Sequence, residues 1–510
     1  MSTAAITRSV VSDPGGIAGL TDEQQLAAGT TAARVFIEAG PGTGKTTVSA
    51  HRFGVHRYEP GVRHDRRAVV AVSFTRAATR NLVHRVQRLW GTRAIAWPHR
   101  VVTLDTIMYD LVHDLLQVGL LTWPNGHTEL RVEDSWASFS GSTWNRTRYW
   151  FTVVEGRVHI HEGFVESRRS SVPATVSVPL LNDGVCTHDD VRNVLELALA
   201  DPQITAYVRG RLGSTMRALI VDEVFDANDL DISIIEMAVD AGVAVSLVGD
   251  PWQALYVFRG ARPDVVPLLL QRKDFRTLTL TQSFRWKHRD QERLAEDLRS
   301  GRPVDLPVTS HETDLAGLDV VLALWWKNLW ELGPGVLPLA FQAFKGGHEE
   351  AAATLLLNHA TRSVFGLDAT YLHDALTALA ITDHAVAQLI EPQLQAITET
   401  LRAGGRASVK AAYTQLADLV SHISPRTLRP AHHSHTSRLA WVQERLAYPG
   451  RPVPGLTTHQ AKGGEWQAVG VRLTAEERKS LARGLTVGRD TDRKLYVACT
   501  RAQLSTVEIT

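Results

Sequence analysis

The chain has 510 residues, of which 44% are hydrophobic and 21% charged, and its formal net charge is +1. At about 150 residues per domain, this length corresponds to roughly three domains. The two cysteines, Cys186 and Cys499, exclude a disulfide-stapled scaffold and a four-cysteine zinc site. The chain has no apolar run of about 18 residues, and its first segment, MSTAAITRSVVSDPGG, lacks the apolar core of a signal peptide. We therefore expect a cytoplasmic protein without membrane contact.

Short apolar and β-branched runs alternate with helix-compatible stretches along most of the chain. This alternation predicts parallel sheets of the α/β class. Runs that are almost wholly apolar are typical of strands covered on both faces. The expected strands are Arg34–Ala39, Ala68–Phe74, Val101–Thr106, Ala218–Glu223, Ala244–Asp250, Thr277–Phe284, Ala468–Thr474 and Ser505–Thr510.

Two stretches interrupt this alternation. Residues 122–185 are rich in tryptophan, serine and glycine, and the segment RYWFTVVEGRVHIHEG predicts a β-hairpin that turns near Glu155-Gly156. Residues 346–445 carry apolar residues at helical spacing and are expected to be mainly helical. Each stretch is therefore a candidate subdomain.

A glycine-rich loop follows the first expected strand and precedes a helix-compatible stretch. Glycines allow successive backbone N–H groups to turn toward a triphosphate, and the helix N-terminus adds partial positive charge. Lys45 would reach the β- and γ-phosphates of ATP, and the Thr46 hydroxyl would bind Mg²⁺. A chance glycine turn is the alternative, which the strand–loop–helix context disfavours. The loop residues are Gly40, Pro41, Gly42, Thr43, Gly44, Lys45, Thr46 and Thr47.

Two adjacent acids end the apolar strand Ala218–Glu223. A phosphate loop needs a carboxylate for the metal and another for the attacking water. Asp222 would hold Mg²⁺ and Glu223 would act as general base. A solvated acidic strand end is the alternative, and it loses weight because the rest of the strand is apolar.

These two features belong to an ordered series of short segments. In chain order the series is Leu20–Gln24, Gly40–Thr47, Ser73–Ala78, Thr103–Thr106, Asp222–Asp226, Gly249–Ala261, Thr281–Arg285, Thr458–Trp466 and Tyr496–Ala502. Each segment resembles, in its place, a motif of the UvrD/Rep-like superfamily 1 DNA helicases. The resemblance extends from about residue 20 to about residue 505, apart from the two interrupting stretches.

The resemblance implies an α/β fold with two RecA-like, parallel-sheet P-loop NTPase cores, each carrying an inserted subdomain. We expect the first core at residues 15–110 and 186–275, with an inserted subdomain at 111–185. We expect the second core at residues 276–345 and 446–510, with a mainly helical insert at 346–445.

The resemblance also implies roles around the nucleotide. Gln24 would read the adenine edge, Phe284 would stack on the base and Glu465 would contact the sugar. Gln253 would sense the γ-phosphate.

Two arginines would complete the implied ATP site from the second core. Arg285 and Arg501 would reach across the cleft as arginine fingers, which are worth on the order of 10³–10⁵ in rate. An ordinary surface position is the alternative for each, because arginine is the commonest cation of this chain.

Single-stranded DNA is the partner that the resemblance implies. Aromatic side chains at Phe74, Tyr256 and Phe258 stand where the family stacks bases, at about 1–3 kcal/mol per base. Burial in a core is the alternative for each ring. The implied DNA-binding residues are Phe74, Thr75, Arg76, Thr103, Tyr256, Phe258, Arg259 and His459.

The implied function is an ATP-dependent 3′→5′ DNA translocase or helicase, acting on single strands and on junctions with duplex, in DNA repair, recombination or phage defence. The alternative is an ATP-gated, DNA-binding subunit that regulates a partner nuclease or repair protein without unwinding DNA itself. Three departures keep this alternative open: Phe225 in place of the family's glutamine, the short helical insert, and a sequence without a nuclease segment.

The tryptophan-rich stretch allows three interpretations. Tryptophan interleaved with arginine suits nucleic acid, a protein interface or, for the tryptophans alone, a small buried core. We hypothesise that the hairpin contacts duplex or a partner ahead of the motor. The residues concerned are Trp123, Trp136, Trp144, Trp150, Arg146, Arg148 and Arg157.

Overall fold

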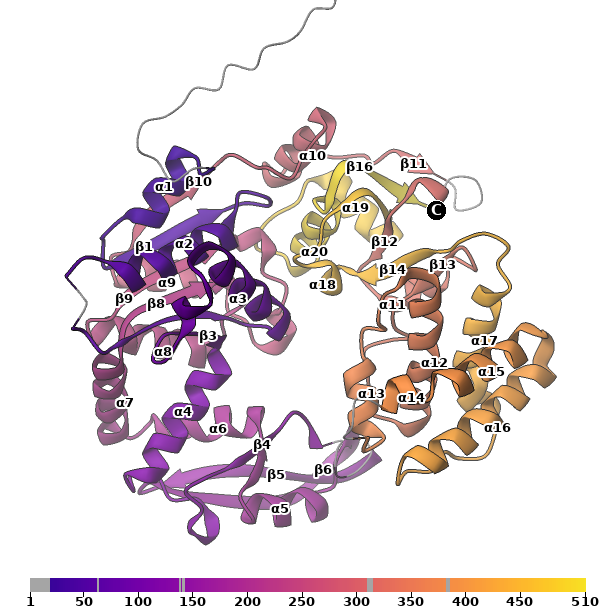
Figure 1. Ribbon diagram of the computed structural model, residues 1–510, viewed down its shortest axis with the longest axis horizontal. Helices are drawn as coiled ribbons and strands as arrows, with labels where there is room; N and C mark the ends of the chain where they lie inside the picture. The colour runs from indigo at the N-terminus through magenta and orange to yellow at the C-terminus, as the bar shows by residue number, and fades with distance from the viewer. Residues whose placement is uncertain (1–18, 62–63, 137–138, 140–142, 310–314, 382–385) are drawn as a thin grey trace, which may run out of the picture.

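The computed structural model describes residues 19–510 apart from 62–63, 137–138, 140–142, 310–314 and 382–385. The expectation about a signal peptide concerns the first 16 residues and lies outside the described part. Figure 1 shows four parts arranged in a ring: two sheet-containing cores, a hairpin subdomain and a helical subdomain. Within the described ranges, every helix is too short or too polar to cross a membrane.

The first core is built on a six-stranded sheet in the order β10-β1-β9-β8-β2-β3. Neighbouring strands are parallel throughout. Alternate residues pack on opposite faces, since Phe36 joins one hydrophobic cluster while Val35 and Ile37 join another. The strands are β1 (Arg34–Ala39), β2 (Ala68–Ser73), β3 (Arg100–Thr103), β8 (Met216–Asp222), β9 (Ala244–Gly249) and β10 (Arg276–Leu280).

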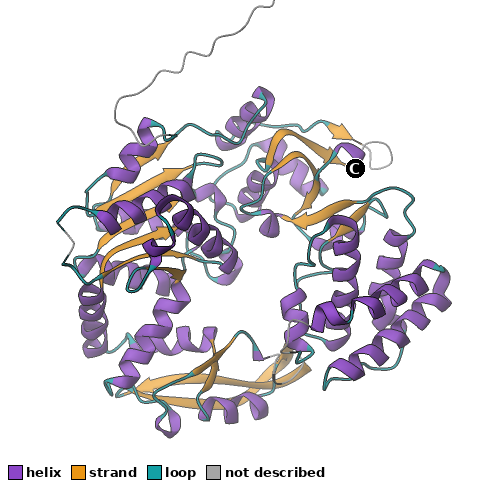
Figure 2. Ribbon diagram, viewed as in Figure 1, coloured by secondary structure: helices purple, strands orange, loops and turns teal. Residues whose placement is uncertain are grey.

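Helices lie beside the strands of this sheet, as Figure 2 shows. A capping box at Thr21 starts α1, and the Thr75 hydroxyl accepts from the Ala78 N–H at the start of α3. Helices of this core include α1 (Asp22–Gly29), α2 (Lys45–Tyr58), α3 (Arg76–Trp90), α7 (Pro202–Thr215), α8 (Asp229–Asp240) and α9 (Val266–Arg272).

Two expected strands end at least three residues earlier in the structure. The strand expected at Val101–Thr106 ends at Thr103, because Leu104, Ile107 and Met108 lie on the buried face of helix α4 (Leu104–Gln117). The strand expected at Thr277–Phe284 ends at Leu280, since the following segment passes over the glycine-rich loop instead.

The boundary expected at residue 276 also needs correction. Strand β10 begins there, but it pairs with β1 in the first sheet, with Val35 opposite Arg276. The second sheet begins after helix α10 (Arg289–Arg299). The connection between the two cores therefore follows β10 rather than preceding it.

The second core contains another six-stranded sheet, ordered β11-β16-β15-β12-β14-β13, and its neighbouring strands are also parallel. The two sheets confirm the expected α/β class with two RecA-like cores. The strands are β11 (Val308–Thr309), β12 (Val320–Ala323), β13 (Val336–Pro338), β14 (Val453–Thr457), β15 (Trp466–Arg472) and β16 (Ala502–Ile509). Its remaining helices are α11 (Trp326–Trp330), α18 (Thr458–Ala461), α19 (Ala475–Arg483) and α20 (Asp490–Cys499).

A helical subdomain separates β13 from β14 in the chain. Its interior is mainly aliphatic, with Leu356, Leu401 and Leu416 fully buried in one cluster. The helices are α12 (His348–Phe365), α13 (Leu372–Ala378), α14 (Val386–Leu389), α15 (Glu391–Arg402), α16 (Gly405–Ile423) and α17 (His433–Leu446).

The hairpin subdomain consists of two long antiparallel strands and short helices. Strands β5 (Thr143–Val154) and β6 (Arg157–Ser171) are joined at Glu155 and Gly156, which have φ of 49° and 70°, where the sequence predicts the turn. The other elements are β4 (Arg131–Glu133), α5 (Ala174–Asn182), β7 (Val185–Thr187) and α6 (His188–Ala198). Strands β4 and β7 pair in parallel.

The two faces of this hairpin differ. The inner face packs against a hydrophobic core that contains Trp123. This tryptophan is buried, and its Nε1 donates to the Leu181 carbonyl at 2.7 Å. On the outer face Trp150 is 38% exposed, with the Arg148 guanidinium 5.2 Å from its ring centroid and the His161 ring stacked at 5.6 Å. Trp123 therefore fits the interpretation of a small buried core. Trp150, which is exposed beside an arginine, fits the interpretations of a nucleic-acid or protein contact.

Candidate nucleotide and nucleic-acid sites

The glycine-rich loop joins β1 to α2 at the carboxyl edge of the first sheet. Gly42 and Gly44 have φ of 73° and 86°, in the left-handed region that favours glycine. A Cβ on Gly42 would lie 2.6 Å from the Ser283 Oγ, so the close approach of residues 281–285 also requires glycine. The Ser283 hydroxyl donates to the Pro41 carbonyl at 2.8 Å. The segment after β10 is thus fixed against the loop.

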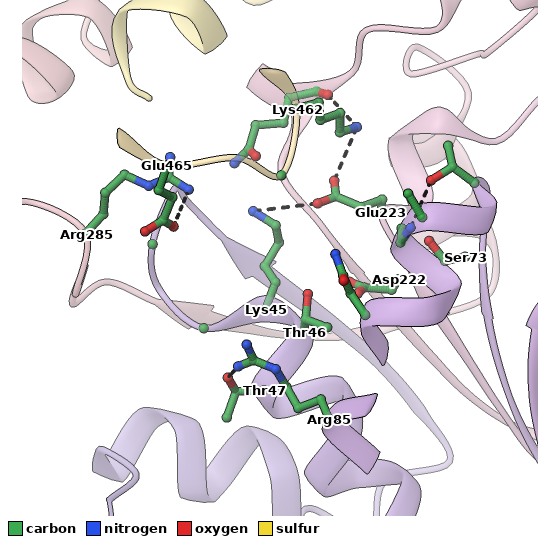
Figure 3. Close-up of a pocket in the computed structure, with 18 of the residues that line it drawn as sticks. Lys45, Thr46, Thr47, Ser73, Arg85, Asp222, Glu223, Arg285, Lys462 and Glu465 are labelled. Carbon is green, nitrogen blue, oxygen red and sulfur yellow. Dashed lines mark hydrogen bonds and ion pairs between the residues drawn. The ribbon is translucent and has the colours of Figure 1, made fainter. Parts of the chain in front are cut away.

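Lys45 lies inside this loop. Its Nζ donates to the Ala39 and Gly40 carbonyls at 3.1 and 3.3 Å and is 4.0 Å from the Glu223 Oε1. Burial lowers the pKa of Lys45, while Glu223 opposes that shift. A phosphate oxygen placed in the loop would meet an ammonium group already positioned there (Figure 3).

Asp222 and Thr46 form an oxygen-rich pair beside Lys45. The Asp222 Oδ1 is buried and has no hydrogen-bond partner among the described residues, and the Thr46 side chain acts on this carboxyl group by lowering its pKa. Burial, followed by the adjacent Glu223 charge, raises the pKa of Asp222 to about 7. An unsatisfied carboxylate oxygen next to a hydroxyl fits Mg²⁺, which prefers oxygen ligands.

Glu223 follows the end of β8 in a left-handed conformation, with φ of 62°. Lys462, from the second core, places its Nζ 3.5 Å from the Glu223 Oε2 and also pairs with Asp226. Burial alone would raise the pKa of Glu223, but the charges of Lys462 and Lys45 outweigh it and lower that pKa. The expected general base is therefore held as a carboxylate by a lysine of the opposite core.

The motif pattern assigned no role to Lys462, which the structure brings into the site. Its Nζ also donates to the Gln253 carbonyl at 2.8 Å. Lysine is much rarer than arginine in this chain, and that rarity was the available signal for this position.

The two expected arginine fingers lie close together. Arg285 donates to the Thr500 carbonyl and to Glu465, both at 2.8 Å. Arg501 is buried, its Nε donates to the Val497 carbonyl at 3.0 Å, and its Nη2 has no partner among the described residues. Burial, with the Arg285 charge adding to it, lowers the pKa of Arg501 to about 9.

The expected position of Arg285 on the second core needs correction. It stands in the connection that follows β10 of the first sheet, and its guanidinium contacts the second core. Arg501 lies directly before β16 of the second sheet, as expected. Arg285 therefore reaches the cleft from the connection, and Arg501 reaches it from the second core.

A cavity of about 910 Å³ joins these groups. Gln24 lines it, with its Nε2 donating to the Thr43 carbonyl at 2.9 Å and its Oε1 accepting from the Thr21 N–H. Phe284 also lines the cavity with its side chain 55% exposed. The residues with expected nucleotide or catalytic roles that line it are Gln24, Gly40, Gly42, Gly44, Lys45, Thr46, Thr47, Asp222, Glu223, Gln253, Phe284, Arg285, Glu465 and Arg501.

A second cavity, of about 1260 Å³, is lined by residues of all four parts. It contains Arg76, Tyr256, Phe258, Arg259 and His459 from the expected DNA-binding set. Phe258 is 64% exposed, so its ring is accessible rather than buried in a core. The Arg259 guanidinium lies 5.5 Å from the Tyr256 and Phe258 ring centroids. Cationic and aromatic groups are thus adjacent, as base stacking and phosphate contact require.

Three residues of the expected DNA-binding set lie elsewhere. Phe74 and Thr75 line the nucleotide cavity. Thr103 lines neither of these two cavities within the described part, and its hydroxyl is 3.1 Å from that of Thr106. The structure therefore divides the expected set between two cavities and the start of α4.

The second cavity also contains residues that the motifs did not identify. Trp325 follows β12, is 64% exposed and has the Lys494 Nζ 5.8 Å from its ring centroid. Lys327 lines the same cavity. The signal was an aromatic and basic run, Trp325-Trp326-Lys327, directly after a buried strand, where parallel-sheet proteins place ligand-binding residues.

Asp134 connects three parts of the ring across this cavity. Its carboxylate accepts from Arg76 of the first core at 2.9 Å and lies 3.1 Å from the Nε2 of His373 in the helical subdomain. The hydrogen bonds from Arg76 lower the pKa of Asp134 well below its usual range. An expected DNA-binding arginine is therefore paired with a carboxylate of the hairpin subdomain.

Comparison with known proteins gives matches to one family model and to several curated relatives. Residues 23–259 match the model of an AAA domain. The chain is 23% identical to the ATP-dependent DNA helicase PcrA of Staphylococcus aureus over an alignment of 287 residues, which covers 52% of this chain and 38% of that protein. It is 25% identical to the ATP-dependent DNA helicase Rep of Salmonella typhimurium over an alignment of 269 residues, which covers 49% of this chain and 39% of Rep. The Escherichia coli Rep helicase is 24% identical over an alignment of 283 residues, which covers 52% of this chain and 41% of Rep. The chain thus spans about two fifths of the length of the curated relatives that it matches.

Proposed function

We propose, on the premise that the chain belongs to the UvrD/Rep-like family of superfamily 1, that it is an ATP-dependent DNA translocase or helicase. The named relatives are ATP-dependent DNA helicases. We further propose 3′→5′ movement on single-stranded DNA. Junctions of single strand and duplex arise in DNA repair, recombination and phage defence, and we place the chain in that group of processes.

One observation carries this proposal: Tyr256 lines both the nucleotide cavity and the cavity of aromatic and basic residues. The Lys462 Nζ lies 5.4 Å from the Tyr256 ring centroid and also contacts Glu223. Lys462 therefore lies between Glu223, the expected catalytic base, and Tyr256 of the expected DNA-binding surface. Such a connection gives a physical route by which DNA binding can change ATP hydrolysis.

Phosphoryl transfer depends mainly on positioning and on charge stabilisation. Lys45 would hold the β- and γ-phosphates, and Glu223 would accept a proton from the attacking water. Arg285 and Arg501 would stabilise the charge that develops on the transferred group. Mg²⁺, bound through Thr46 and Asp222, would neutralise phosphate charge when present.

The remaining nucleotide contacts follow from the cavity lining. Phe284, which is exposed, would stack on the base, and Gln24 would read its edge. Gln253 would sense the γ-phosphate. In the structure, the Glu465 carboxylate accepts a hydrogen bond from Arg285. A bound sugar would therefore compete with Arg285 for this carboxylate.

DNA would bind in the second cavity. Tyr256, Phe258 and Trp325 would stack on successive bases, while Arg259 would contact phosphates. Stacking is tolerant of sequence, which suits a motor that moves along any strand.

The decisive experiment measures ATP hydrolysis and strand displacement by the purified chain, with and without a single-stranded oligonucleotide. A translocase predicts hydrolysis stimulated by the oligonucleotide, and displacement from a duplex with a 3′ overhang. Stimulated hydrolysis without displacement would favour the regulatory alternative, in which a partner nuclease or repair protein supplies the output. Failure of a bound oligonucleotide to stimulate hydrolysis would contradict the translocase, and failure of the oligonucleotide to bind would contradict both candidates.

A further inference from the structure

Helix α10 packs on the second core through Leu298, and the side chain of Arg299, its last residue, contacts the first core. Its Nη1 donates to the Asp250 Oδ1 at 2.9 Å and its Nη2 donates to the Glu38 Oε1 at 3.1 Å. A Cβ added to Gly40 would lie 3.9 Å from the same Nη1. The guanidinium therefore lies beside the glycine-rich loop, between the ends of β1 and β9.

Asp250, which forms an ion pair with Arg299, is completely buried. Its Oδ2 accepts from the Gln253 Nε2 at 2.8 Å, and its Oδ1 accepts from the Trp252 N–H at 3.2 Å. A buried carboxylate is costly unless it is paired and hydrogen-bonded. Arg299 supplies the ion pair, while Asp250 fixes the orientation of the Gln253 amide.

We propose that Arg299 is a positioning residue that orients Gln253 through Asp250 and makes this orientation depend on contact between the two cores. The inference rests on the proposed function, in which Gln253 senses the γ-phosphate. Arg285 and Arg501 line the nucleotide cavity, whereas the lining does not include Arg299. Arg299 thus acts on the reaction through Asp250 and Gln253 rather than by touching the nucleotide.

A comparison of Arg299→Ala, Arg299→Lys and Arg302→Ala tests the contact. Arg302 is a matched control, because it is exposed near the same helix end and pairs with Asp297. We expect Arg299→Ala to lower the DNA-stimulated kcat about tenfold, with the KM for ATP changed less than about threefold. Arg299→Lys, which keeps one charged contact, should recover part of kcat. Equal effects of Arg299→Ala and Arg302→Ala would overturn the proposal.

A double-mutant cycle with Gln253→Ala separates positioning from a general structural role. If Arg299 acts through Gln253, adding Arg299→Ala to Gln253→Ala should lower kcat little further, because the two residues act as a unit. Fully additive losses would show that Arg299 acts independently of Gln253 and would contradict the proposal.

Amide hydrogen exchange provides a readout that does not need hydrolysis. Because the Trp252 N–H donates to Asp250, Arg299→Ala should speed exchange at residues 250–254 while Arg302→Ala leaves it unchanged. Absence of hydrolysis by the wild-type chain would overturn the proposed function, and the exchange rates would still decide the role of Arg299. Unchanged exchange in a folded Arg299→Ala protein would refute that role.

Discussion

The Lys462 Nζ of the second core lies 3.5 Å from the Glu223 Oε2 of the first core. The same ammonium group donates to the Gln253 carbonyl, so it contacts the expected general base and the expected phosphate sensor together. Burial alone would lower the pKa of Lys462, but Asp226 and Glu223 raise it above its ordinary value, and the group stays charged at neutral pH. Separation of the two cores would break these contacts.

Lys462→Ala should therefore reduce the stimulation of ATP hydrolysis by single-stranded DNA more than it reduces ATP binding. We expect a loss of about tenfold or more in stimulated kcat, because the buried Asp226 and the partly buried Glu223 would lose their shared cation. Lys479→Ala is the control, since Lys479 is exposed and pairs with Glu476. Steady-state hydrolysis at several oligonucleotide concentrations checks this, and a normal stimulation ratio in Lys462→Ala would contradict it.

Lys45→Ala should abolish DNA-stimulated hydrolysis and leave most of the affinity for single-stranded DNA. The reason is that Lys45 lies inside the glycine-rich loop, whereas the aromatic and basic groups lie in the other cavity. Hydrolysis and fluorescence anisotropy of a labelled oligonucleotide measure the two properties. Residual hydrolysis above a few per cent of the wild-type rate would show that Lys45 is not the phosphate-binding lysine.

Much of the fold could be predicted because buried parallel strands have a simple signature. The strand expected at Arg34–Ala39 matches β1 at both ends, since a glycine-rich loop follows it directly. The strand expected at Val101–Thr106 was too long because Leu104 and Ile107 are apolar in either a strand or a helix. Only the helical spacing of the later residues assigns them to α4.

The candidate site was predictable where one short segment carries it, as at Lys45 and Thr46. Contacts between distant segments were not. Lys462 and Glu223, which are in contact, are separated by 239 residues in the sequence. The contact of Arg299 with Asp250 depends on how the two cores pack. No local pattern encodes either contact.

Removal of either cross-cleft arginine should affect turnover more than nucleotide binding. Arg285→Ala and Arg501→Ala each remove positive charge that matters most in the transition state. We expect kcat to fall on the order of 10³-fold for Arg501→Ala, whose Nη2 has no partner among the described residues. Parallel measurement of ATP-analogue affinity and kcat checks this. Proportional losses in both would instead indicate structural roles.

Asp134→Asn should strengthen the binding of single-stranded DNA. The carboxylate of Asp134 neutralises Arg76, so a DNA phosphate must compete with it. We expect affinity to rise several-fold at low salt, with a steeper salt dependence because an additional cation becomes available. Asp264→Asn is the control, since Asp264 is exposed and pairs with Arg262. Oligonucleotide titrations at several salt concentrations measure the effect, and unchanged affinity and slope would contradict the competition.

The outer face of the hairpin gives the last prediction. Deleting the hairpin would remove Phe151 and Val158, which are buried in its core, so point substitutions on the exposed face are the sharper test. Combining Arg148→Ala with Trp150→Ala removes the exposed cation–π pair and leaves those buried residues in place.

We expect this double variant to retain ATP hydrolysis stimulated by single-stranded DNA but to lose strand displacement or partner binding. Trp150 and Arg148 present an aromatic surface and a positive charge to duplex or to a partner. Neither residue lines the nucleotide cavity. Trp97→Ala is the control, because Trp97 is 86% exposed on the first core. Helicase assays on a 3′-overhang duplex, beside hydrolysis assays, measure the separation of the two activities. A folded double variant that displaces strands and binds partners like the wild type would exclude a contact role for this face.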